Sequence, residues 1–127
     1  MIVAYWTGAE PVEVRTAVGP PSRDGIKAGR LRDFARGRGL AAYLVHGEVA
    51  DLEHEVRQGR PVLVGLAKPT GRKGYVLTHY EVVVGYHPAR RVVVTLDPAL
   101  GWRQNSLDGF LAEWKPAGRL ALVVSGP

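Results

Sequence analysis

The spacing of apolar side chains changes near residue 61, and this change predicts the fold class. Before it, apolar residues recur at helical intervals in segments that begin or end at Gly, Pro, Ser or Asp. After it, continuous or alternating apolar runs are separated by turn residues, as in strands. Because the helices precede the strands, the sequence predicts an α+β fold with N-terminal helices packed on a C-terminal antiparallel sheet.

Helices are expected in most of the first part of the chain. The predicted helices are Ile2–Thr7, Val12–Val18, Ile26–Arg38 and Val49–Gln58, with a short strand at Leu40–Val45. The first helix has no N-capping residue before it and would be marginal at this length. We therefore expect it to be the truncated end of a longer, buried helix.

The second part of the chain is expected to form the sheet. Its predicted strands are Pro61–Ala67, Val76–Tyr86, Arg91–Leu96 and Arg119–Val124. The segments KPTGRKG and GWRQN are expected to be loops, and Ser106 is expected to cap a helix that runs from Leu107 to Trp114. No repeat or linker interrupts the chain, so residues 1–127 are expected to form a single domain.

The chain contains no cysteine, which narrows the chemistry that it can perform. Disulfides, thiolate metal sites and a thiol nucleophile from these residues are excluded. The fragment LEHE lacks the HExxH spacing of a zinc site, so no metal or other cofactor is expected. No apolar run approaches the ~20 residues of a membrane span, and no signal peptide is expected because the first residues lack a basic region and a small-residue cleavage site. A cytoplasmic location is the default expectation.

A basic balance raises the question of nucleic-acid binding, because the net charge is +5. Most of the excess comes from the stretch between Arg23 and Arg38. No nucleic-acid motif is recognisable, and aromatic residues do not alternate with the basic ones. The stretch is interpreted as a solvated helix face, and no nucleic-acid partner is expected.

Of the histidines, His79 is the one whose position suggests chemistry. A three-residue turn would pair Tyr86 with Arg90, and counting outward from that pair places His79 opposite Asp97 on one face of the sheet. A carboxylate in that place would orient an imidazole and stabilise its charged form. An ordinary cross-strand pair at a sheet edge explains the same pattern equally well.

The residues alone supply no nucleophile for such a pair. No Ser or Thr lies in a Gly-x-Ser-x-Gly elbow, Ser106 is explained as a helix cap, and Thr78 would point away from His79. Structural or exposed positions are expected for the remaining histidines, His46, His54 and His87.

One pattern in the second part runs His, apolar strand, turn, second strand and Asp-Pro. It occupies THYEVVVGYHP and VVVTLDPALGW, which are followed by SLDGFLAEW and LALVV. These segments resemble the bacterial papain-like cysteine peptidases of family thirty-nine, which include the double-glycine leader peptidases of bacteriocin exporters. The resemblance implies a papain-like fold and hydrolysis of a peptide or protein substrate, with His79 as the catalytic histidine and Asp97 as the acidic residue that orients it.

In that family the nucleophilic cysteine opens the first helix, in a Cys-Gly motif that follows an oxyanion-stabilising glutamine. The segment IVAYWTG resembles the end of that helix, so this chain starts too late to contain either residue. Either the protein begins upstream of Met1, or this is a degenerate domain. The chain alone is therefore expected to be inactive, and either to self-associate beside Ile2, Val3 and Trp6 or to be completed by an upstream segment. A non-catalytic peptide-binding module is the alternative function, and a nucleic-acid-binding domain ranks third.

Overall fold

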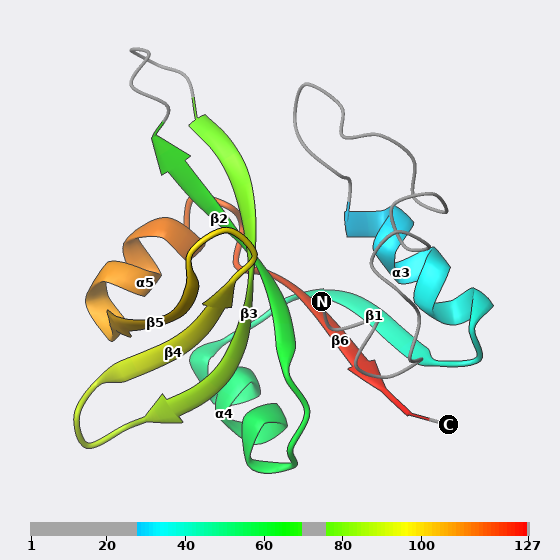
Figure 1. The fold of residues 1–127 in the computed structure, drawn as a ribbon, viewed down its shortest axis with the longest axis horizontal. Coiled ribbons are helices and arrows are strands. Elements are labelled where there is room, and N and C mark those ends of the chain that lie inside the picture. The colour runs from blue at the N-terminus through cyan, green and yellow to red at the C-terminus, as the bar shows by residue number, and fades with distance from the viewer. Residues whose placement is uncertain (1–27, 70–75, 127) are drawn as a thin grey trace.

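The computed structural model describes residues 28–69 and 76–126 of the chain (Figure 1). The predicted helices Ile2–Thr7 and Val12–Val18 lie outside the described residues. The same holds for the expected truncation of the first helix, for the apolar surface expected beside it, and for most of the predicted loop KPTGRKG.

The described residues form one antiparallel sheet with helices packed against it, which confirms the predicted α+β class. The sheet has six strands in the order β1-β6-β2-β3-β4-β5 (Figure 1). The strands are β1 (Ala41–His46), β2 (Val62–Pro69), β3 (Val76–His87), β4 (Val92–Asp97), β5 (Gly101–Ser106) and β6 (Leu120–Ser125). The helices are α3 (Ala28–Gly37), α4 (Val49–Arg57) and α5 (Leu107–Trp114).

Apolar side chains pack on both faces of the sheet, because successive residues of a strand point to opposite sides. On one face, Val82 of β3 belongs to a buried cluster with Leu31 of α3. On the other face, Val83 belongs to a second cluster with Leu52 of α4 and Phe110 of α5. Helix α3 therefore covers one face, and α4 and α5 pack on the other.

Side chains hold helix α5 in place at both ends. Ser106 caps the helix as predicted, since its Oγ accepts a hydrogen bond from the Gly109 N–H at 3.0 Å. At the other end, Trp114 is fully buried and its Nε1 donates to the Leu120 carbonyl at 3.0 Å. The Trp114 ring also contacts Phe110, with 5.3 Å between ring centroids. These contacts fix the start of α5 and tie its end to the first residue of β6.

The segment GWRQN was predicted to be a loop, and this prediction is wrong because it forms most of β5. Strand β5 lies at the edge of the sheet and pairs with β4. Its residues alternate between half-buried and exposed, and the Trp102 side chain is exposed. A polar edge strand of this kind needs no apolar run, so the hydrophobic pattern does not reveal it.

The turn between β3 and β4 is longer than predicted. We expected Tyr86 to pair with Arg90, whereas His87 pairs with Val92 and four residues form the turn. Arg91 ends this turn with a φ of 51°, in the left-handed region. The predicted register of the two strands is therefore wrong.

A β-bulge in β3 changes the register once more. The pairing shifts between Val83 and Gly85, where β3 holds one residue more than β4. Beyond the bulge, the continuing register places Glu81 rather than His79 opposite Asp97. His79 lies two residues before Glu81 in β3 and on the same face, so it reaches Asp97 diagonally.

Candidate catalytic site

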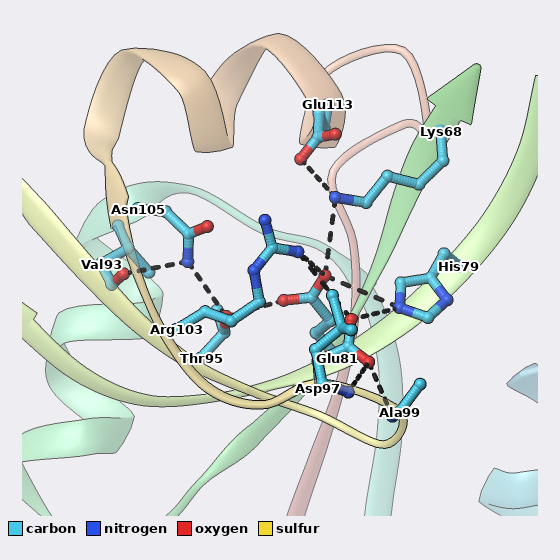
Figure 2. Close-up of polar contacts among 11 residues, drawn as sticks. Lys68, His79, Glu81, Val93, Thr95, Asp97, Ala99, Arg103, Asn105 and Glu113 are labelled. Carbon is cyan, nitrogen blue, oxygen red and sulfur yellow. Dashed lines mark hydrogen bonds and ion pairs between the residues drawn. The ribbon is translucent and has the colours of Figure 1, made fainter.

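His79 and Asp97 form a hydrogen bond in which His79 Nε2 lies 2.8 Å from Asp97 Oδ2 (Figure 2). His79 lies in the first half of β3, and its side chain is 30% exposed. Asp97 ends β4, and its side chain is 3% exposed. The structure thus brings together the two residues singled out from the sequence, through a diagonal contact instead of the predicted direct opposition.

Hydrogen bonds hold both carboxylate oxygens of Asp97. Oδ1 accepts the backbone N–H groups of Ala99 at 2.7 Å and Leu100 at 3.1 Å, in the turn after β4. Burial alone raises the pKa of Asp97, but the hydrogen bond from His79 and the two backbone N–H groups outweigh burial and lower the pKa from 3.8 to about 2. Asp97 is therefore an ionised, firmly held acceptor at neutral pH.

The ionised Asp97 determines which nitrogen of His79 carries hydrogen. A carboxylate only accepts hydrogen bonds, so Nε2 donates. In the neutral ring Nδ1 is then an acceptor, and Figure 2 shows it on the side of the ring away from Asp97. An imidazole oriented in this way can take a proton at Nδ1 and hold the resulting charge beside a carboxylate.

Glu81 is a second carboxylate at the site, and the sequence analysis missed it. Its side chain is 1% exposed, and its Oε1 accepts a hydrogen bond from Thr95 Oγ1 at 2.7 Å. Thr95 Oγ1 in turn accepts from the Asn105 side-chain amide at 3.0 Å, which leaves the hydroxyl hydrogen for Glu81. The available signal was an acidic residue inside the apolar run YEVVVG.

Two cations compensate the buried carboxylates of Glu81 and Asp97. Arg103 Nη1 lies 3.5 Å from Glu81 Oε2 and 3.9 Å from Asp97 Oδ2. Lys68 Nζ lies 3.6 Å from Glu81 Oε2 and 2.8 Å from Glu113 Oε1. Both cations come from segments that were predicted to be loops, so sequence reasoning missed them as well. Within the described ranges, His79, Glu81 and Asp97 are the group whose donor atoms lie close enough together to hold a metal ion.

The other histidines lie apart from this group. His46 Nδ1 is 2.7 Å from the Gly118 carbonyl oxygen, a contact that joins β1 to the turn before β6. His54 on α4 and His87 at the end of β3 are exposed. These positions agree with the structural or exposed roles expected for them.

A family model described as the Peptidase_C39 like family matches residues 35–122. The chain belongs to this family. The match spans both strands of the candidate site and confirms the resemblance seen in the sequence. No curated protein sequence matches this C39-like chain.

Solved structures of C39 peptidases share the fold of this domain. A C39-like peptidase from Bacillus anthracis has a TM-score of 0.78 and 16% identity, covering 99% of this chain and 84% of that one. The peptidase domain of Streptococcus ComA, a bifunctional ABC transporter of a quorum-sensing pathway, has a TM-score of 0.72 and 18% identity, covering 99% and 88%. These two likenesses establish the papain-like fold.

A third structure is a double-glycine motif protease from an AMS/PCAT transporter, in complex with the leader peptide. It has a TM-score of 0.75 and 25% identity, covering 100% of this chain and 79% of that one.

Within the part of the C39-like domain that the structure describes, no helix has the length and apolar character needed to cross a bilayer.

Proposed function

We propose that this domain carries the acid–base half of a C39-type cysteine peptidase. In this proposal His79 transfers the proton, and Asp97 orients the His79 ring. The observation that supports this most directly is the hydrogen bond from His79 Nε2 to an Asp97 carboxylate that two backbone N–H groups also hold. A carboxylate held in this way keeps the imidazole in one orientation and in one tautomer.

The reaction would use the nitrogen of His79 that Asp97 leaves available. Nδ1 accepts the proton of a thiol, and the thiolate attacks the carbonyl carbon of the peptide bond. The imidazolium then donates this proton to the amine that leaves, and an acyl-enzyme remains. His79 next takes a proton from water while the water oxygen attacks the acyl carbon. The C–S bond then breaks, the carboxylic acid leaves, and the imidazolium returns its proton to the sulfur. Because these 127 residues contain no cysteine, the thiol must come from residues outside them.

The proposed substrate is a peptide or protein segment with an accessible backbone. Support comes from the family and from the relative that was solved with its leader peptide. We propose a peptide in which a double-glycine motif is followed by further residues as the first substrate to test, since that relative is a double-glycine motif protease.

The test compares this chain with the same chain extended by the residues encoded in frame upstream of Met1. The extended protein should hydrolyse a double-glycine leader peptide, and His79→Ala should lower kcat by ~100- to 10,000-fold. His87→Ala, at an exposed position, is the matched control and should keep full activity. The 127-residue chain should show no turnover and no labelling by a thiol-alkylating reagent. An extended protein without cysteine, or one whose hydrolysis survives His79→Ala, would contradict the proposal.

A further inference from the structure

Three side chains from two neighbouring strands direct one donor atom each toward a common point: His79 Nε2, Glu81 Oε2 and Asp97 Oδ2 (Figure 2). These donor atoms all lie within 4.8 Å of one another. We propose that the three residues form a binding site for a divalent transition-metal ion, of which zinc is the first candidate. Metal binding requires the ring hydrogen of His79 on Nδ1 instead of Nε2, so the ion would replace the hydrogen bond to Asp97 and would block the proposed proton transfer. The test of binding itself requires no peptidase activity.

The two carboxylates are already oriented as metal ligands usually are. One oxygen of each is occupied, because Thr95 donates to Glu81 Oε1, and the N–H groups of Ala99 and Leu100 donate to Asp97 Oδ1. The other oxygen of each faces His79. Partners outside the ligand set that fix a ligand in this way are a general feature of metal sites.

Glu81 Oε2 is the observation that points to a ligand. This oxygen is buried and has no hydrogen-bond partner among the described residues. A buried polar atom without a hydrogen bond is costly and rare in folded proteins. Arg103 and Lys68 face this oxygen only at ion-pair distances of 3.5 and 3.6 Å, so a metal ion bound to Oε2 would give it the direct bond that it lacks.

The spacing and the donor types suit zinc or a neighbouring transition metal. His79 Nε2 lies 2.8 Å from Asp97 Oδ2 and 3.7 Å from Glu81 Oε2. A tetrahedral ion with bonds of about 2.0–2.1 Å separates its ligand atoms by roughly 3.3 Å. The two His79 distances would therefore change by about 0.5 Å, and the two carboxylate oxygens, which lie within 4.8 Å, would approach each other by up to about 1.5 Å. One imidazole and two carboxylates leave a fourth position for water.

Arg103 and Lys68 compete with the metal ion for the same oxygens. Their nitrogens lie 3.5 and 3.6 Å from Glu81 Oε2. Both side chains are partly exposed and long enough to turn toward solvent, and Glu113 already holds Lys68 at 2.8 Å. Metal binding would therefore displace the positive side chain of Arg103 or Lys68 from Glu81. Removal of Arg103 should for this reason strengthen metal binding.

The experiment titrates the purified chain with zinc chloride in a calorimeter and with cobalt chloride by visible absorption. Zinc is expected to bind with one-to-one stoichiometry, and thiolate ligation cannot contribute because the chain lacks cysteine. Glu81→Gln should weaken binding by at least about tenfold, and Thr95→Val by ~10- to 100-fold. Arg103→Gln should tighten it by about tenfold, because a nearby positive charge is removed. His87→Gln, which changes an exposed histidine, should bind as the parent does.

The proposal is overturned if neither the parent nor Arg103→Gln binds zinc saturably, or if Glu81→Gln binds as tightly as the parent. Loss of the binding in His87→Gln would place the metal elsewhere and would overturn it too. Circular dichroism of each variant shows whether the fold is retained, and Thr95→Val tests the site if Glu81→Gln does not fold. The readout involves no hydrolysis, so a negative result leaves the proposed peptidase function untouched.

Discussion

Thr95 Oγ1 lies 2.7 Å from Glu81 Oε1, and this hydrogen bond joins β4 to β3 at a point where both side chains are buried. It also extends the polar group inward from His79, because Asn105 of β5 donates to Thr95. The candidate site is therefore part of a hydrogen-bonded chain that crosses three strands of the sheet.

Replacing Thr95 by Val should destabilise the domain. The change leaves Glu81 Oε1 and one Asn105 N–H without their partner in a buried setting, so the free energy of unfolding should fall by about 1–3 kcal/mol. Urea denaturation measures this effect. Thr95→Ser keeps the hydroxyl and should lose clearly less stability. Equal losses for Val and Ser would mean that packing, and not the hydrogen bond, is responsible.

Acid should remove the stabilisation that Asp97 provides. The pKa of Asp97 is about 2 in the folded protein, below its ordinary value of 3.8. Because the folded state holds this proton more weakly, stability is fully present above about pH 4 and is lost as the pH falls toward about 2. Urea midpoints of the parent and Asp97→Asn should therefore differ at neutral pH and converge in acid. A constant difference across this range would contradict the low pKa.

Two tryptophans at opposite extremes of burial give a matched pair of variants. Trp114 is fully buried, whereas Trp102 is 71% exposed. Trp114→Ala should lower the free energy of unfolding by about 3–5 kcal/mol, because it leaves a cavity under α5. Trp102→Ala should change it by about 0.5 kcal/mol or less. Thermal melts followed by circular dichroism distinguish the two, and comparable losses would show that Trp102 is covered in solution.

Substitution of Gly101 should destabilise the domain because its backbone lies in the left-handed region. It pairs with Asp97 at the start of β5 and has a φ of +79°. Alanine at this position should cost about 1–2 kcal/mol, since a Cβ disfavours the left-handed region. Gly37→Ala, at the end of α3 where an added Cβ meets no neighbour within 4 Å, is the control and should be neutral or stabilising. Chemical denaturation of both variants provides the comparison.

Much of the fold could be predicted from the sequence, because its main elements have strong local signals. The apolar run at β2, the long strand β3 and the Ser106 cap of α5 are examples, and all are present. Strand β5 could not be predicted in this way. Its polar residues gain their strand conformation from pairing with β4, which is a tertiary effect.

The candidate site was predictable only in part. His79 and Asp97 stood out because a titratable pair near two strand ends is unusual, and because the family pattern contains both. Glu81, Lys68 and Arg103 have no motif of their own, and they meet through the register of β2, β3, β4 and β5. Their grouping depends on long-range pairing, which residue spacing along the chain does not reveal.

The bulge in β3 decides which face of the sheet receives His79. Near the turn, Tyr86 pairs with Val93, and an uninterrupted ladder continued from there would set Asp97 opposite Val82. Tyr86 and Val93 pack on the α4 and α5 side, so an uninterrupted ladder would keep Asp97 and Val82 on that side and would turn His79 toward the α3 side. The one surplus residue in the strand reverses this parity. The contact between His79 and Asp97 thus depends on the number of residues in β3. A single-residue insertion or deletion in this strand can abolish the contact without changing any side chain of the site.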